Sequence, residues 1–307
     1  MSNLSSVFRR LLKTPIKKRF RKRNIIHFPD NILHPSRIAI ISGASDPDIW
    51  PAMYLADMLQ NAYPDTNMSI ICKAVDGELL NMLQWKPRIH YYDKYPQMPS
   101  LLDDEKFTDD TLFFYPYTTI DNEVGELLMI SGAGVRIAPL ENDSPYINLR
   151  VLTDSTAFPL VLQQMCSALG IRSETTWKPV IQQQVREKAA EMMAPVSGRA
   201  LPYIVTTSSA ISILEKHRAE IPLRTVSLGG KSTDFENLDR ETRAAIIAGA
   251  SAVATDSEDL WSDACALDVP VIALDTSDTF IRWCNYSTVS NENDFIEAWS
   301  QLLRTGW

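Results

Sequence analysis

Three short segments of the sequence combine residue types that could bind or transform an anionic substrate. The first is Asp46-Pro47-Asp48, which stands between a predicted strand and a predicted helix. A carboxylate there could take the proton from an attacking hydroxyl group, and a helix N-terminus would favour its charged form. Asp46 could equally cap the helix, with Pro47 at the first helical position. Two carboxylates at this spacing could also bind a metal ion, but the spacing is common by chance, and we expect no metal site.

The second segment is Gly229-Gly230-Lys231, which follows a predicted strand. The backbone amides of a glycine pair and a nearby ammonium group could bind a diphosphate. A complete phosphate loop would need a glycine at position 225, where Thr225 stands, so we do not expect a nucleotide hydrolase of that class. A plain surface turn explains the same residues equally well.

The third segment, residues 256–263, is acidic. Asp256, Glu258, Asp259 and Asp263 lie in or near the first turn of a predicted helix, where negative charge complements the helix dipole without any ligand. A diphosphate that approached these carboxylates would be repelled, by up to about 4 kcal/mol for each close contact.

The elements that must position these segments follow a repeated strand-turn-helix pattern, which is typical of α/β proteins with parallel sheets. We expect two Rossmann-like domains, residues 37–194 with a helical connection and residues 195–307 with a closing helix, and a ligand in the cleft between them at the carboxyl ends of the strands. The predicted strands are 37–42, 68–72, 90–92, 112–115, 135–138, 203–207, 224–228, 252–255 and 271–274. The predicted helices are 49–61, 77–83, 122–131, 157–169, 180–193, 239–249, 260–267 and 292–303.

The N-terminal arm, residues 1–36, is basic and the rest of the chain is acidic. The 307-residue chain has a net charge of −8, yet residues 1–29 hold nine basic and no acidic residues, which leaves −17 for the remainder. Apolar residues at positions 4, 7, 8, 11 and 12 predict a short amphipathic helix before Pro15. The nine basic residues are Arg9, Arg10, Lys13, Lys17, Lys18, Arg19, Arg21, Lys22 and Arg23.

Such an arm suits an anionic membrane surface, because its apolar stripe can enter the interface while each basic residue contributes about 1 kcal/mol at most. A flexible solubilising tail is the alternative. We expect no nucleic-acid binding, since the acidic remainder would repel a second polyanion. No apolar run could span a membrane, no secretory signal is evident, and the cysteines and histidines lack ligand spacing. We therefore expect a cytoplasmic protein without cofactor or disulfides.

Several motifs resemble those of the ADP-heptose lipopolysaccharide heptosyltransferases, glycosyltransferase family 9. The similarity extends over residues 37–305. It rests on Arg37-Ile38-Ala39-Ile40, Pro51-Ala52-Met53, Ala62-Tyr63-Pro64-Asp65, Ser131-Gly132-Ala133-Gly134-Val135-Arg136-Ile137-Ala138, the segment 245–253, and 264–274.

This resemblance implies a GT-B fold and transfer of a sugar, with inversion and without a metal, from a nucleotide-diphosphate donor to a lipid-linked glycan such as lipopolysaccharide core. The protein would then act at the inner face of a bacterial inner membrane. The resemblance implies that Asp46 is the base, and that Gly229, Gly230, Lys231, Asp256, Ser257 and Ser262 lie along the donor.

The sequence departs from the family at the residues that carry its chemistry. Asp46 stands one place later than the family's loop aspartate, and the family's DTGxxH motif is replaced after Asp256, with Ser262 in the place of its histidine. A second interpretation is therefore a catalytically inactive GT-B protein that serves as a binding or scaffold subunit at the membrane.

Overall fold

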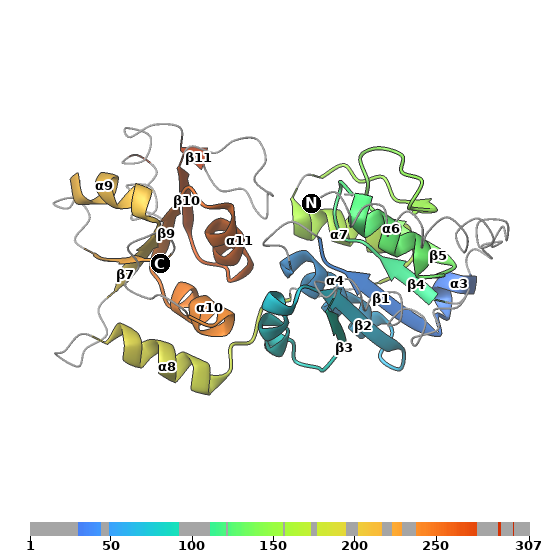
Figure 1. Ribbon diagram of the computed structural model, residues 1–307, viewed down its shortest axis with the longest axis horizontal. Coiled ribbons are helices and arrows are strands. Elements are labelled where there is room, and N and C mark those ends of the chain that lie inside the picture. The colour runs from blue at the N-terminus through green and yellow to red at the C-terminus, as the bar shows by residue number, and fades with distance from the viewer. Residues whose placement is uncertain are drawn as a thin grey trace, which may run out of the picture.

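The computed structural model describes eleven segments of the chain, and these contain two parallel sheets arranged side by side (Figure 1). The segments are residues 30–43, 49–91, 111–120, 122–155, 157–172, 177–194, 202–216, 223–228, 238–274, 288–289 and 297. The basic residues of the arm, Asp46 and Gly229-Gly230-Lys231 lie outside the described residues, as does most of the predicted helix 292–303.

The first sheet has the strand order β3-β2-β1-β4-β5-β6 within the described residues, and all its pairs are parallel. Its central strands are largely buried because helices cover the sheet; Ile38 to Ile41 of β1, for example, are fully buried. The strands are β1 (Arg37–Ile41), β2 (Asn67–Cys72), β3 (Arg88–Tyr91), β4 (Thr111–Phe114), β5 (Val135–Ala138) and β6 (Leu149–Arg150). The helices of this half are α3 (Asp30–Leu33), α4 (Trp50–Ala62), the 3-10 helix η1 (Ala74–Met82), α6 (Asn122–Ile130) and α7 (Phe158–Ala168).

The second sheet has the order β11-β10-β9-β7-β8, also parallel throughout. Figure 1 shows α10 and α11 on the side that faces the first half and α9 on the other side, while α8 packs against α10. The strands are β7 (Tyr203–Thr206), β8 (Arg224–Ser227), β9 (Ala252–Thr255), β10 (Val271–Leu274) and β11 (Thr288–Val289). The helices are α8 (Gln183–Met193), α9 (Ser208–Lys216), α10 (Arg240–Ala248) and α11 (Glu258–Ala266).

Each sheet has one place where the chain reverses its direction of travel across the sheet. In the first sheet this switch point lies between β1 and β4, and in the second it lies between β7 and β9. In open parallel sheets, ligands bind outside the carboxyl ends of the strands at such a point. A ligand-binding site is therefore expected at the segments that follow β1, β4, β7 and β9.

The expected α/β architecture is confirmed, and several local predictions are corrected. Residues 77–82 belong to a 3-10 helix rather than an α-helix, the strand expected at 90–92 begins at Arg88, and the helix expected at 180–193 begins only at Gln183. The amide of Val180 donates instead to the carbonyl oxygen of Met82, at 3.1 Å, which ties the connection between the halves to η1. Ile32 of α3, inside the arm predicted from sequence, is 1% exposed and belongs to the core. No helix in the described part of the chain is long and apolar enough to cross a membrane.

Candidate active site at the facing sheet edges

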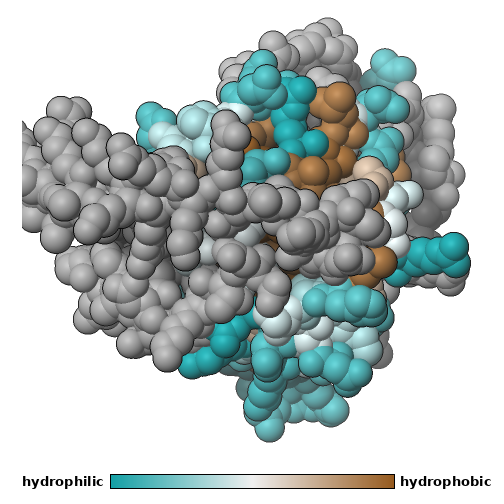
Figure 2. All heavy atoms as spheres, turned by 90° about the vertical axis from the view of Figure 1, so that its right-hand side faces the viewer, coloured by the Kyte–Doolittle hydropathy of each residue, from teal (hydrophilic) through white to brown (hydrophobic). Residues whose placement is uncertain are grey.

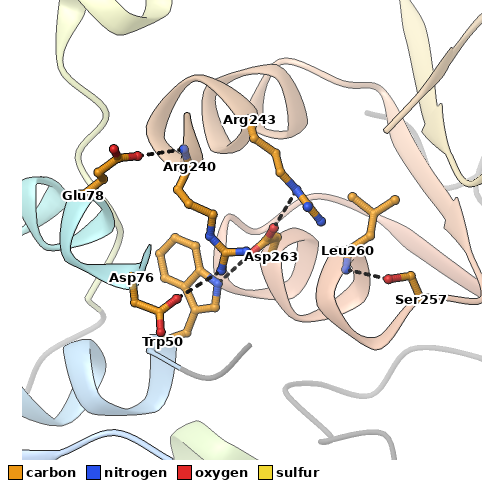
Figure 3. A network of polar contacts seen from close by, with 8 residues as sticks. All are labelled: Trp50, Asp76, Glu78, Arg240, Arg243, Ser257, Leu260 and Asp263. Atoms are coloured by element: carbon orange, nitrogen blue, oxygen red, sulfur yellow. Dashed lines mark hydrogen bonds and ion pairs between the residues drawn. The ribbon is translucent and has the colours of Figure 1, made fainter. Parts of the chain in front are cut away.

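The switch points of the two sheets face one another across the boundary between the halves. Trp50 is the first residue of α4, which follows β1, and its indole Nε1 donates to Oδ1 of Asp263 in α11 at 2.9 Å (Figure 3). Helix α11 follows β9 of the second sheet. Both side chains are almost fully buried, Trp50 at 0% exposure and Asp263 at 2%. The segments that follow β1 and β9 are thereby held at a common location.

Asp263 also binds within its own half. The Nε atom of Arg243, in α10, lies 3.3 Å from the other carboxylate oxygen of Asp263. Figure 3 shows this carboxylate between the indole from the first half and the guanidinium from the second. One buried charge therefore connects three helices.

A second polar contact joins the halves between η1 and α10. A guanidinium nitrogen of Arg240 lies 3.5 Å from Oδ1 of Asp76, which is 4% exposed, and the amide of Arg240 donates to Glu78 at 3.0 Å (Figure 3). The two contacts restrain the relative position of the sheets at two different helices of the second half.

The structure brings Asp256 and Ser257 to the switch point of the second sheet. Asp256 follows β9 and accepts a 2.6 Å hydrogen bond from the hydroxyl of Thr207, which follows β7. Ser257 caps α11, since its hydroxyl accepts from the amide of Leu260 at 3.5 Å. Ser262 lies further along α11 and is 3% exposed. Two of the three described donor-site candidates thus lie at the carboxyl edge, while the third is buried in the helix packing.

The first turn of α11 is acidic, as the sequence indicated. It contains Glu258 and Asp259, and burial, together with the charge of Asp259, raises the pKa of Glu258. Negative side chains here complement the helix dipole but disfavour an anionic ligand at the same helix end. A diphosphate bound near α11 would therefore need cations from another segment.

The facing edge of the first sheet is aromatic. The rings of Tyr115 and Tyr117, directly after β4, have centroids 4.9 Å apart, and Tyr117 also contacts Phe158 at 5.8 Å. Trp177, in the connection between the halves, contacts Trp50 at 6.3 Å. These rings form a packed aromatic cluster beneath the carboxyl edge of the first sheet, and Trp50, Tyr115, Tyr117 and Phe158 are all buried.

Two buried hydroxyl groups at the carboxyl edges have no hydrogen-bond partner among the described residues. They belong to Ser42, directly after β1, and to Ser227, the last residue of β8. Buried hydroxyl groups are nearly always hydrogen-bonded in proteins, so the hydroxyl of Ser42, which lies at the switch point of the first sheet, is available to a ligand or to water. Ser227 ends the edge strand β8 and lies away from the switch point of the second sheet.

The sequence carries no signal that Trp50, Asp76, Arg240 or Arg243 belong to the interface between the halves. A usable signal existed only for Asp263. It lies on α11 among Leu260, Trp261 and Ala264, all buried, and a carboxylate on an apolar helix face indicates a buried partner.

The fold is similar to that of solved glycosyltransferases over nearly the whole chain. E. coli ADP-heptose LPS heptosyltransferase II superposes with a TM-score of 0.62 at 14% sequence identity, covering 88% of this chain and 99% of that one. A glycosyl transferase family 9 protein from Veillonella parvula gives 0.69 at 11% identity, over 89% and 99%. E. coli heptosyltransferase WaaC, solved with ADP-2-deoxy-2-fluoro heptose, gives 0.61 at 13% identity, over 88% and 100%.

No protein-family model matches the sequence, and no curated protein does. The similarity is therefore one of fold, and it confirms the GT-B architecture expected from the motif resemblance. Identities of 11–14% leave the reaction and its residues to be argued from this chain itself.

Proposed function

We propose that this chain is a glycosyltransferase that moves a sugar, of the ADP-heptose type, from a nucleotide-diphosphate donor to a hydroxyl group of a lipid-linked glycan such as lipopolysaccharide core. The observation that carries the proposal is the pair of facing switch points, fixed by Trp50 and Asp263, in a GT-B fold shared with heptosyltransferases over 88% of this chain. A switch point on each side lets one half bind the donor and the other the acceptor.

In the proposed reaction, Asp46 takes the proton of the acceptor hydroxyl while the sugar is transferred with inversion. Asp46 lies four residues before Trp50 in the sequence, and Trp50 is the residue of the first half that contacts Asp263. Gly229, Gly230 and Lys231 would supply the positive charge that the acidic start of α11 lacks, and neutralise the leaving diphosphate without a metal. Asp256 and Ser257 would contact the donor from the end of β9, with Ser262 behind them.

A donor titration tests the binding part of this proposal. ADP-, UDP- and GDP-sugars are added in turn to the full chain, and the melting temperature is recorded. We expect saturable stabilisation by one of them, because a ligand that binds only the folded state raises its stability. Lys231→Ala should abolish the stabilisation, with Lys216→Ala as the control in the same half.

A turnover measurement tests the base. Asp46→Asn should reduce turnover by a factor of about 10² or more with nearly unchanged donor affinity, since general-base catalysis typically supplies 10² to 10⁴. Asp48→Asn is the matched control and should have a smaller effect. Equally small losses of turnover in the two variants would indicate that Asp46 caps the helix and does not act as the base.

A scaffold subunit without activity is the second candidate, and the acidic first turn of α11 favours it. Asp256 bonded to Thr207 and Asp263 bonded to Trp50 both serve the protein's own structure. If this candidate is correct, no nucleotide sugar stabilises the protein at millimolar concentration, and Lys231→Ala has no effect on melting in the presence of any of them.

Under either candidate function, the N-terminal arm would bind the chain to an anionic membrane. Deleting residues 1–29 should release the chain from anionic vesicles and leave the melting temperature unchanged, because the core begins with Ile32. Binding of the full chain should weaken as salt is added, since exposed charges are screened. Equal vesicle binding with and without the arm would contradict this role.

A further inference from the structure

A cavity of about 400 Å³ lies at the edge of the first sheet that is remote from the candidate active site. It opens at the amino ends of β1, β2 and β3, whereas Trp50 and the facing switch points lie beyond their carboxyl ends. The lining residues are Arg37, Gln60, Thr66, Asn67, Met68, Ser69, Trp85, Lys86 and Arg88. The proposed transfer reaction makes no use of this cavity.

The lining is basic although the chain as a whole is acidic. Three of the nine residues are cations, Arg37, Lys86 and Arg88, and none is acidic, in a chain whose net charge is −8. Arg37 and Arg88 are the first residues of β1 and β3, which pair with opposite sides of β2. Arg37 is paired with Asn67 and Arg88 with Ser69, two residues further along β2, so the sheet register places both arginines on the same face of the sheet, one on each side of β2.

The remaining lining supplies hydrogen-bonding groups and one apolar wall. The hydroxyls of Thr66 and Ser69 and the amides of Gln60 and Asn67 are uncharged. Met68, 6% exposed, and Trp85 form the apolar part. The volume of the cavity falls within the range of pockets that bind small organic ligands, and its mostly polar lining suits a charged ligand rather than an apolar one.

Arginine side chains in this arrangement suit a phosphoryl group, because the guanidinium fork binds phosphate oxygens in pairs. The cavity is larger than a phosphate ion, so it has room for the organic group that carries the phosphate. We propose that this cavity is a second binding site, separate from the site of transfer, for the phosphoryl group of an organic phosphate.

The cavity lies where the N-terminal arm joins the body. The arm runs into β1 at Arg37, and Thr66, which lines the cavity, donates from its hydroxyl to the carbonyl oxygen of Pro35 at 3.4 Å. The hydroxyl of Tyr63 donates to the carbonyl oxygen of Ile32 at 2.8 Å. Figure 2 views the molecule from this end, and hydrophilic residues cover the lower part of the surface. A phosphate in a membrane that binds the arm would therefore meet this cavity, as would a soluble phosphate ester.

The experiment compares the full chain with Lys86→Gln/Arg88→Gln, and uses Arg172→Gln as the control. Arg172 is an exposed cation of the same half that does not line the cavity. The first measurement titrates glycerol 1-phosphate and follows the melting temperature. The second measures binding to vesicles of phosphatidylcholine with and without phosphatidylglycerol, using full chains and chains that lack residues 1–29.

The double variant should weaken binding by about tenfold or more in at least one of the two measurements, since it removes two charge-assisted contacts, while Arg172→Gln binds like the full chain. Loss of vesicle binding alone assigns the phosphate to a lipid headgroup, and loss of glycerol 1-phosphate binding assigns it to a soluble ester. The proposal would be overturned if Arg172→Gln and the double variant had equal effects, or if the protein showed neither binding to glycerol 1-phosphate nor binding to vesicles that depends on phosphatidylglycerol. Neither outcome bears on transfer, because the test contains no sugar donor.

Discussion

Two aspartates five residues apart, in and just beyond helix α11, form ion pairs in opposite surroundings, one buried and the other exposed to solvent. The side chain of Asp263 is 3% exposed and lies between Trp50 and Arg243. Asp268, just beyond the helix, is 70% exposed and pairs with Lys178, itself 73% exposed, at 2.9 Å. Both pairs have good distances, yet only the buried one excludes water. Burial, rather than the presence of an ion pair, decides how much each carboxylate contributes to the free energy of unfolding.

We expect the largest loss of stability from Asp263→Ala. The substitution leaves the guanidinium of Arg243 and the indole of Trp50 without their shared partner at a buried boundary. We expect the free energy of unfolding to fall by about 3–5 kcal/mol, as for other buried pairs that lose one member. Urea denaturation followed by tryptophan fluorescence measures the loss.

The control for this variant is Trp50→Phe, which removes the hydrogen bond but keeps a ring and leaves Asp263 paired with Arg243. It should cost about 1–2 kcal/mol, part of which reflects the smaller ring. If Asp263→Ala cost no more than Trp50→Phe, the carboxylate would not be the centre of this contact.

An intermediate case tests whether burial scales the effect. The side chains of Arg240 and Asp76 are 16% and 6% exposed, and their distance of 3.5 Å is longer than in the Asp263 contacts. Asp76→Asn should therefore lower the free energy of unfolding by about 1–2 kcal/mol, between the two extremes. Glu78→Gln, at an exposed contact with the Arg240 amide, is the matched control and should cost less. A loss as large as that of Asp263→Ala would contradict a dependence on burial.

Asp239 adds a dependence on pH. Burial raises the pKa of Asp239, but hydrogen bonds from Lys188 and Thr242 outweigh burial and lower it from 3.8 to about 2. Because the pKa of the folded state lies below that of the unfolded state, the stabilisation is present above pH ~4 and is lost as the pH falls toward about 2. The side chain is 39% exposed, so solvent screening reduces the contribution to about 1 kcal/mol.

Denaturation of the wild-type chain and of Asp239→Asn at several pH values checks this. The difference in unfolding free energy between them should be about 1 kcal/mol near pH 6 and should vanish as the pH approaches 2. A difference that does not change with pH would mean that the cap of α10, rather than the charge, carries the effect.

The sequence predicted the strands well because their signals are local. The ranges of β5, β9 and β10 match the expected ones to the residue, since each is a short, largely apolar run bounded by glycine, proline or polar residues. The helix expected from position 180 fails for a non-local reason. The amide of Val180 is bonded to Met82 of the other half, and no periodicity within the segment reports that contact.

The candidate site was predictable only in part. Parallel strands and switch points follow from the order of elements, so Asp256 and Ser257 could be placed at a carboxyl edge. The Trp50–Asp263 hydrogen bond joins residues 213 apart in sequence, and Thr207 reaches Asp256 across 49. Such pairings depend on how the two sheets and their connections pack, which a single sequence does not specify.

For the exposed residue Asp268 we expect the smallest effect on stability, and a substitution there should stabilise the chain rather than destabilise it. Asp268 has a φ of 60°, a left-handed conformation that glycine adopts more readily. It follows the last turn of α11 in a Schellman arrangement, in which Val269 donates to Ala264 and Asp268 to Cys265. Asp268→Gly should therefore stabilise the chain by about 0.5 kcal/mol, even though it removes an ion pair. Lys178→Gln removes the same pair without a backbone effect and should leave the unfolding midpoint unchanged, so a stability loss in both variants would show that this exposed pair matters after all.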